Sequence, residues 1–267
     1  MSVIALSSLD LALAALLVLG LAALSFPIGL GLSQQLLIAA TRTVVQLLLI
    51  GFVLKALFEN VNLVWVTLMA FVMLAVAARE VVARQKRRLA GWWSFGIGGV
   101  SMFLSTFAIT ILALVVIIGP EPWYQPQYAI PLLGMVLGNT MTGIALALDR
   151  LTEAAWQQRA IIEARLMLGH TWQQAIDNVR RDSMRSGLIP MINAMAAAGL
   201  VSLPGMMTGQ ILAGSPPLEA VKYQILIMFM IASGTGFGTL MTVRVAAWRL
   251  FDERERLRLE RLKGRKA

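Results

Sequence analysis

SFGIGGVSMFLSTFAITILALVVII, residues 94–118, contains no charged residue and exceeds the roughly 20 apolar residues that a helix needs to cross a bilayer. Similar stretches lie on both sides of it, at residues 5–26, 35–57, 62–79, 130–148, 190–214 and 222–246. The whole chain is 58% hydrophobic and only 14% charged, which excludes a soluble domain. An outer-membrane barrel would show short alternating segments instead. The sequence therefore predicts an all-α, polytopic helical membrane protein with about seven transmembrane helices.

Lys and Arg are strongly concentrated in alternate loops between these stretches. Basic groups lie at residues 79–88, 150–185 and 244–266, whereas the loops near 58–61, 119–129 and 215–221 contain neither Lys nor Arg. Basic loops of membrane proteins stay on the cytoplasmic side. We therefore expect the three basic groups and the C-terminus to be cytoplasmic. With an odd number of spans, the N-terminus lies outside.

The charge and the domain division follow from this topology. A net charge of +9 is explained by the basic loops and by attraction to anionic membrane lipids, so no nucleic-acid partner is expected. We divide the chain into a transmembrane domain, residues 1–248, and a basic cytoplasmic tail, residues 249–267. Alternating Arg and Glu residues in the tail predict a charged helix that extends the last span.

Several motifs for chemistry are missing from the sequence. No G-x-x-x-x-G-K-[ST] is present, so the chain cannot hydrolyse ATP through a P-loop of its own. No Asp or Glu lies near the middle of a span, which argues against the intramembrane acids of ion-driven carriers. The chain has no Cys, and we place its single His, His170, in a solvated loop. We therefore expect a chain that is not an enzyme, holds no cofactor and takes its energy from a partner.

The longest polar segment between spans, residues 149–189, contains two helical stretches. The first covers roughly residues 152–168 and is ended by Gly169, the residue best suited to a left-handed cap. Thr171 and Gln174 form a capping box that opens the second helix. A helix–Gly–helix arrangement suits force transmission from a cytoplasmic partner. An amphipathic helix pair lying at the membrane interface explains the same pattern.

Several strings of the sequence resemble motifs of known proteins. EARLMLG, residues 163–169, resembles the E-A-A-x-x-x-G coupling loop of ABC transporter permeases, with Arg165 in place of the second Ala. GLVSLPGMMTGQILAG, residues 199–214, followed by KYQI at residues 222–225, resembles more specifically the FetB (YbbM) family of these permeases. Gly138-Asn139-Thr140-Met141 and Arg42 with Gln46-Leu47 also fit that family. The resemblance covers essentially the whole chain.

The resemblance implies a seven-span permease that works with a separate ATPase subunit, on which ATP and Mg²⁺ would be bound. It implies a homodimer in a bacterial inner (plasma) membrane. It also implies that Glu163, Ala164, Gly169 and Thr171 couple the permease to the ATPase subunit. Bacterial members of the family are linked to iron export and metal resistance, and plant relatives to aluminium tolerance. The transported substrate is therefore left open.

The sixth span, residues 190–214, is the least regular of the predicted helices. We expect Pro190 to start it, and Pro204 with the neighbouring glycines to break or soften it. Broken helices in membranes are packed by protein or line a cavity. The residues that we expect to line a translocation path are Arg42, Asn139, Thr140, Met141, Ser202, Pro204, Met206, Met207, Thr208 and Gln210.

Three features of the spans each allow two interpretations. Arg42 either snorkels to the cytoplasmic head groups or faces a charged partner or substrate. The fifteen Met residues either fill irregular packing or offer soft ligands, so the metal ligands stay unassigned. Small residues four apart allow close helix contacts, within the chain or between two copies. Such pairs are Gly134/Gly138, Gly205/Gly209 and Gly234/Gly238.

Taken together, these patterns lead us to expect the membrane-spanning permease subunit of an ABC transporter that exports iron or another metal. Two alternatives stay open. One is a passive channel or carrier that needs no ATPase. The other is a non-transporting membrane scaffold that recruits cytoplasmic proteins through its basic loops.

Overall fold

The computed structural model describes residues 7–29 and 31–264. Its α-helices are α1 (Ser8–Ser25), α2 (Ser33–Glu59), α3 (Leu63–Arg84), α4 (Trp93–Met102), α5 (Ala108–Leu112), α6 (Pro126–Gln157), α7 (Arg159–Met167), α8 (Trp172–Ala175), α9 (Asp177–Ala197), α10 (Gly205–Leu212) and α11 (Pro217–Arg249). A π-helical segment, η1 (Phe103–Phe107), joins α4 to α5, and a second one, η2 (Ala113–Ile118), continues α5, so that the four segments form one rod. Strand β1 (Arg87–Leu89) pairs with β2 (Leu262–Gly264), which follows a 3₁₀ turn, η3 (Leu259–Arg261).

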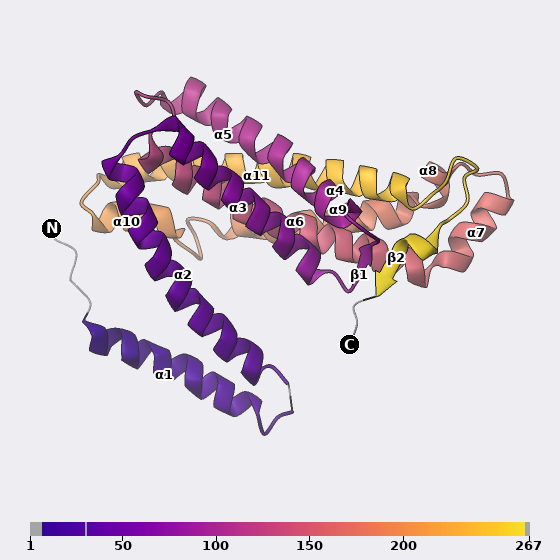
Figure 1. Ribbon diagram of the computed structural model, residues 1–267, viewed down its shortest axis with the longest axis horizontal. Helices are drawn as coiled ribbons and strands as arrows, with labels where there is room; N and C mark the ends of the chain where they lie inside the picture. Colours follow the sequence, from indigo (N-terminus) through magenta and orange to yellow (C-terminus); the bar gives the residue numbers. More distant parts are fainter. Residues whose placement is uncertain (1–6, 30, 265–267) are drawn as a thin grey trace.

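The long helices α3, α6, α9 and α11 and the rod from α4 to η2 run alongside one another and form the body of the molecule (Figure 1). α6 and α11 lie at its centre, with Val136, Ile144 and Val243 fully buried. α1 and α2 form a hairpin that diverges from this body (Figure 1). Most apolar side chains of the hairpin are exposed, which suits contact with lipid acyl chains.

The predicted all-α, polytopic membrane fold is confirmed. Within the part of the chain that the structure describes, six helical segments are long and apolar enough to cross a membrane. They correspond to the predicted first to fifth and seventh spans. The predicted first span begins at residue 5, and residues 5 and 6 lie outside the described residues, as do residues 265–267 of the predicted tail.

The sixth predicted span, residues 190–214, is not one helix. α9 ends at Ala197, residues 198–204 are non-helical, and α10 then begins at Gly205. The prediction that Pro190 starts the span is wrong, because Pro190 lies inside α9. α9 continues across it because one buried stripe runs along the helix at four-residue spacing, through Val179, Ser183, Gly187 and Met191.

Glycines bring α6, α9 and α11 into very close contact. A Cβ added to Gly187 of α9 would lie 2.6 Å from the carbonyl oxygen of Gly143 on α6. A Cβ added to Gly143 would lie 2.6 Å from Cγ2 of Thr235 on α11. Real Cβ atoms do not approach other atoms this closely, so the three helices can pack at this distance only with glycine.

The three G-x-x-x-G pairs have different surroundings. Gly234 and Gly238 face α6, where added Cβ atoms would lie 2.6 Å from Val136 Cγ1 and 2.8 Å from Thr140 Cγ2. This pair therefore packs within the chain. Gly134 approaches a side chain of α3, whereas Gly138 has open space. Gly205 and Gly209 also have no described neighbour within 4 Å of an added Cβ.

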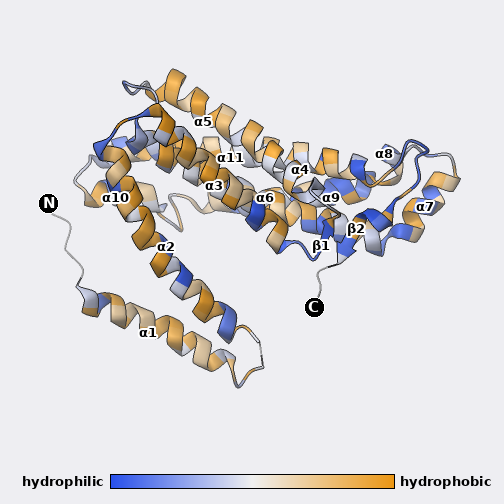
Figure 2. Ribbon diagram, in the orientation of Figure 1, coloured by the Kyte–Doolittle hydropathy of each residue, from blue (hydrophilic) through white to orange (hydrophobic). Residues whose placement is uncertain are grey.

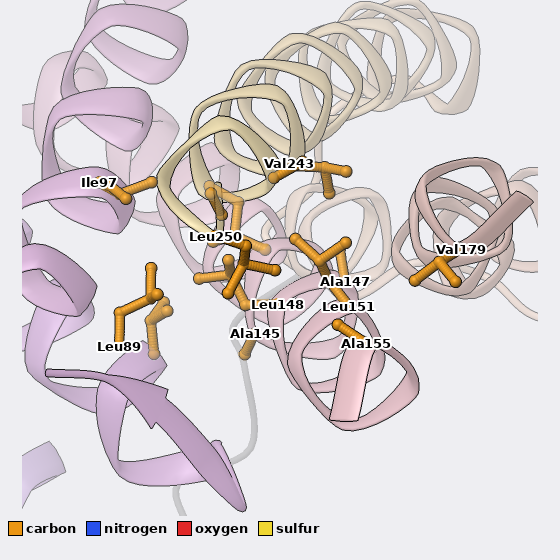
Figure 3. Packing of buried hydrophobic residues seen from close by; sticks show 14 of the residues in the cluster. Leu89, Ile97, Ala145, Ala147, Leu148, Leu151, Ala155, Val179, Val243 and Leu250 are labelled. Atoms are coloured by element: carbon orange, nitrogen blue, oxygen red, sulfur yellow. The ribbon is translucent and has the colours of Figure 1, made fainter. Parts of the chain in front are cut away.

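A hydrophobic core lies at the end of the body where α6 meets the end of α11. Leu148 and Leu250 occupy its centre, with Leu89 and Ile97 on one side and Val179 on the other (Figure 3). These residues come from α6, α9, β1 and α4 and from the segment after α11. The core therefore fixes several polar segments of the chain against the ends of the spans.

Figure 2 shows hydrophilic residues concentrated at this same end of the molecule, where β1, α7, α8 and β2 lie. These elements belong to the predicted basic groups at residues 79–88 and 150–185 and to the described part of the third, residues 244–264. The predicted helical extension of the last span is wrong, because α11 ends at Arg249 and the chain turns back. The C-terminal tail, residues 250–264, then runs to β2 and pairs with β1. Burial explains the turn: Leu250 and Phe251 are 0% and 5% exposed, and a straight helix would place them in water.

Candidate functional site

Two structural features bear on function: the helix pair that follows α6 and the break in the sixth predicted span. We call α7, the turn after it and α8 the elbow, residues 159–176. The predicted first helix of this region, residues 152–168, is divided in the structure. Residues 152–157 belong to the end of α6, and α7 begins at Arg159.

The turn of the elbow has the predicted chemistry. Gly169 has φ +86°, the left-handed conformation that favours glycine, and its N–H donates to the carbonyl of Leu166 at 3.0 Å. The capping box is confirmed: the Thr171 N–H donates to Gln174 Oε1 at 3.0 Å, and the Gln174 N–H donates to Thr171 Oγ1 at 3.5 Å. These local bonds define the turn that connects α7 to α8.

The elbow has one buried side and one exposed tip. Ile162 and Ile176 are 1% and 0% exposed and anchor the elbow in the core, whereas Met167 and Leu168 are 82% and 78% exposed. The predicted coupling residues Glu163, Ala164, Gly169 and Thr171 are all exposed on the same elbow. The structure therefore brings these four residues together on an accessible apolar and polar surface.

The C-terminal tail holds the second half of the elbow. The backbone N–H of Trp172, at the start of α8, donates to Glu255 Oε2 at 2.6 Å. The rings of Trp172 and Phe251 lie 5.6 Å apart at 33°. Glu255 has φ +57°, unusual for a residue with a side chain, and this conformation fits its role of reaching the α8 terminus. Sequence reasoning missed this contact, because it treated the tail as a solvated helix.

Asp252 organises the loop that carries Glu255. Its Oδ1 accepts from the N–H groups of Arg254 and Arg256 at 3.0 and 2.9 Å, and its Oδ2 accepts from Arg256 Nε at 2.9 Å. The Arg256 backbone N–H is the main cause that holds the pKa of Asp252 below its ordinary value of 3.8; burial opposes it, and smaller contributions from the Arg256 side chain and the Arg254 N–H lower the pKa further. The ionised carboxylate therefore stabilises this loop.

The loop between α3 and α4 is joined to α6 beside the elbow. Arg87 Nε donates to Glu153 Oε2 at 3.1 Å, and the Arg87 guanidinium lies 4.2 Å from the centre of the Trp156 ring. The Lys86 N–H donates to Asp149 Oδ1 at 2.7 Å. With the β1–β2 pairing, these contacts make the elbow, the tail and the end of α6 one connected unit.

The residues predicted to line a path in the fifth span point in different directions. Thr140 is fully buried between α6 and α11, close to Gly234. Asn139 is exposed, and its Nδ2 donates to the Met135 carbonyl at 2.8 Å. Met141 packs against the core of the body. Thr140 therefore contributes to the packing between α6 and α11, whereas Asn139 lies on an outer face of α6.

The predicted path residues of the sixth span surround the helix break. Ser202 is exposed in the non-helical segment, and Pro204 directly precedes α10. Thr208 Oγ1 donates to the Pro204 carbonyl at 3.3 Å. Met206 packs against the body, whereas Met207 faces a groove. Gln210 is partly buried, and its Oε1 has no hydrogen-bond partner among the described residues.

That groove lies between the end of α9, the break, α10 and the first half of α11, and has a volume of about 500 Å³. Met195, Met207, Gln224 and Met228 contribute to its lining, together with Pro204. Gln224 is 8% exposed, and its Oε1 has no partner among the described residues. Gln224 was not among the predicted path residues, although an amide inside an otherwise apolar span is a detectable signal.

Arg42 does not reach the groove. Its Nη2 donates to Glu80 Oε1 at 2.7 Å, which ties α2 to the end of α3. The third span was predicted to end at residue 79, just before Glu80. In the structure α3 continues to Arg84, so Glu80 lies on the helix and can pair with Arg42. A cationic side chain on a span is stabilised by such a partner, so Arg42 has a structural explanation.

Relatives of this chain are membrane proteins in bacteria and plants. The "UPF0014 membrane protein slr1647" of Synechocystis is 44% identical over 234 residues, covering 86% of this chain and 88% of the relative. The "Probable iron export permease protein FetB" of Escherichia coli is 32% identical over 259 residues, covering 95% and 96%, which confirms the resemblance to FetB. "Protein ALUMINUM SENSITIVE 3" of Arabidopsis thaliana is 33% identical over 239 residues, covering 89% and 85%.

The family assignment rests on nearly the whole chain. No solved structure matches it significantly. Residues 8–251 match the family model described as "Uncharacterised protein family (UPF0014)". With the multi-span helical architecture described above, the chain belongs to the UPF0014 family of membrane proteins.

Proposed function

We propose that this chain is the permease subunit of an ABC transporter, which exports iron or another metal and is driven by a separate ATPase subunit. The ATPase would bind ATP and Mg²⁺ and dock on the elbow, and two copies of the chain would form a homodimer in a bacterial inner membrane with the basic end in the cytoplasm. The name of the Escherichia coli relative refers to iron export, and that of the Arabidopsis relative to aluminium. These names support a metal or a metal complex as the cargo.

The observation that carries the proposal is the exposed apolar tip of the elbow. Met167 and Leu168 are 82% and 78% exposed, although the same elbow buries Ile162 almost completely. The tip lies at the basic, polar end of the molecule, away from the apolar lengths of the spans (Figure 2). A partner that covers these two side chains would gain about 25 cal/mol for each Å² of apolar surface buried.

α9 supplies the mechanical connection from the elbow to the interior. It has 21 residues, so it spans about 30 Å from the elbow to the helix break. Gly187 packs it tightly against α6 and α11, so α9 moves with its neighbours as a rigid element. Beyond Ala197 the non-helical segment can change conformation more easily than a helix. Displacement of the elbow would therefore change the shape of the groove at the break.

Substitution of the elbow tests this proposal. Gly169→Ala places a side chain at φ +86°, where non-glycine residues are strained, whereas Asn tolerates this conformation and Gly169→Asn is the matched control. We expect Gly169→Ala and Glu163→Ala to separate ATP hydrolysis by the partner from metal efflux, and Gly169→Asn to do so much less. The thermal unfolding temperature in detergent should fall only slightly, since the added Cβ meets no described atom within 4 Å and the backbone strain of about 1–2 kcal/mol is confined to this turn.

Normal coupling in both Gly169→Ala and Glu163→Ala would contradict the proposed contact. Metal efflux that continues after removal of every candidate ATPase would instead favour a passive channel or carrier. A scaffold would be favoured by two results together. Substitutions at Pro204 and Asn139 would leave efflux unchanged, and substitutions in the basic loops would abolish recruitment of the partner.

A further inference from the structure

We propose that the groove beside the helix break binds a soft, monovalent metal cation, of which Cu⁺ is the biological example. The ligands would be the thioethers of Met195, Met207 and Met228 and the amide oxygen of Gln224. As a binding site, the groove stands independently of any transport. As the place where the cargo is held, it rests on the proposed permease function and narrows the cargo to a soft cation.

The three thioethers come from three different elements. Met195 lies near the end of α9, Met207 lies in α10, and Met228 lies in α11, and all three line the same groove of about 500 Å³. Met195 is 37% exposed, so the groove is accessible from outside the body. Unbranched Met side chains can adjust to a small ion within such a space.

Gln224 gives the groove a polar group that lacks a protein partner. Its side chain is more than nine-tenths buried, and its Oε1 accepts no hydrogen bond from any described residue. Gln224 lies seven residues beyond Pro217, about 10 Å along α11, so this amide is within the apolar length of the helix. Buried amide oxygens are normally satisfied, and a bound cation would satisfy this one.

The charge of the donor set selects a monovalent ion. Thioethers and an amide are uncharged, so they do not neutralise the ion that they bind. The cost of moving an ion into an apolar environment rises with the square of its charge, so a divalent ion is disfavoured about fourfold more than a monovalent one. Lys222, the nearest cation along α11, is exposed and paired with Glu219 at 2.7 Å.

Sulfur ligands add chemical selectivity to this charge preference. Thioethers favour Cu⁺ and similar soft ions, whereas ferric iron and aluminium favour carboxylate and other oxygen ligands. Among the residues that the structure describes, no group of three His, Cys, Asp or Glu side chains could hold a hard metal ion. The groove therefore points to a soft cation rather than to a bare ferric or aluminium ion.

Silver(I) binding to the purified full-length chain tests the site. Ag⁺ is a redox-inert probe of Cu⁺ sites, and a nitrate buffer avoids silver chloride. The chain contains no Cys, so thiolates cannot account for binding, and a tag without histidine limits the background to His170 and the Met residues outside the groove. Isothermal titration would give the affinity, and X-ray absorption at the silver edge would identify sulfur neighbours.

The groove variant is Met195→Leu/Met207→Leu/Met228→Leu, and the matched control is Met69→Leu/Met73→Leu/Met241→Leu, whose residues lie outside the groove. Leu preserves side-chain volume, and thermal unfolding checks that both are folded. Loss of a residue that only orients a metal ligand lowers metal affinity by about 10- to 100-fold. The groove variant loses three direct ligands, so its Ag⁺ affinity should fall by at least this factor. If that variant does not fold, Met228→Leu and Gln224→Leu singly should each weaken binding.

Wild-type chain and control should bind about one Ag⁺ with sulfur neighbours, and the groove variant should not. Equal binding by a folded groove variant, or no binding by the wild type, would overturn the site. An ATPase that co-purifies with a chain unable to bind Ag⁺ would leave the proposed function intact and remove this inference. Ag⁺ binding by a chain that has no ATPase partner would leave the metal site intact and contradict the proposed function.

Discussion

The backbone N–H of Trp172 donates to the Glu255 carboxylate at 2.6 Å, and this bond joins two residues 83 positions apart. It places a carboxylate at the start of α8, where an acceptor for a helix N-terminal N–H is favourable. The elbow is therefore capped twice, by its own Thr171 and by the C-terminal tail. Any movement of the elbow must carry the tail with it or break this bond.

Glu255→Ala should loosen the elbow. Loss of an N-terminal cap costs about 0.5–2 kcal/mol, so we expect faster hydrogen exchange at residues 172–176 with little change in global unfolding. Glu253→Ala is the matched control, because Glu253 is exposed in the same loop and forms no described hydrogen bond or ion pair. Equal exchange in both variants would show that the tail does not hold the elbow.

Gly187→Ala should destabilise the body. The added Cβ would lie 2.6 Å from the Gly143 carbonyl oxygen and 2.9 Å from Thr239 Cγ2, so α9 must move away from α6 and α11. Overpacking of this kind costs about 1–3 kcal/mol. The measurement is thermal unfolding in detergent, with Gly236→Ala on α11 as the control, since no described atom lies within 4 Å of its added Cβ. A Gly187→Ala variant as stable as Gly236→Ala would contradict the observed helix packing.

Reversal of either charge in the Arg42–Glu80 pair should weaken the contact between α2 and α3. Arg42→Glu and Glu80→Arg each place like charges where a 2.7 Å ion pair now lies. The double exchange should restore much of the loss, and a coupling energy of about 0.6–1.7 kcal/mol is expected from polar contacts between membrane helices. A double-mutant cycle on unfolding measures it. Additive effects would indicate that Arg42 acts through lipid head groups instead.

The tail should detach from the elbow at low pH. The folded-state pKa of Asp252 is lowered, chiefly by the Arg256 backbone N–H, so its stabilising contribution is complete above the ordinary value of 3.8. It is lost as the pH falls below 3.8 and through the lowered folded value. Trp172 fluorescence should report this change, since its ring packs on Phe251. Asp252→Asn should remove the pH dependence, and a transition that persists in this variant would argue against Asp252.

The sequence predicts most of the fold because span length and hydrophobicity are local properties. The positions of the first five spans and the seventh, the left-handed turn at Gly169 and the Thr171 capping box all depend on neighbouring residues, and each is found in the structure. The C-terminal tail was predicted wrongly because its charge pattern is that of a solvated helix. Its course is decided by a non-local event, the burial of Phe251 against the elbow.

The candidate site is predictable only in part for the same reason. Composition identifies the sixth span as irregular, but it cannot tell a kink at Pro204 from a complete break before α10. Nor does it show that Thr140 is packed against α11 while Met207 lines a groove. The partners of Arg42 and of Trp172 lie 38 and 83 residues away, and only the fold brings them together.

Co-purification of the tagged chain from its native membrane in mild detergent tests the central claim most directly. We expect a P-loop ATPase in equal amount, identified by mass spectrometry. It should be lost from the Met167→Glu/Leu168→Glu variant, in which the elbow tip is charged, and retained by the exposed-site control Gln173→Glu. Recovery of the wild-type chain as a stable dimer without an ATPase, in several detergents, would contradict the claim that this membrane protein is driven through its elbow.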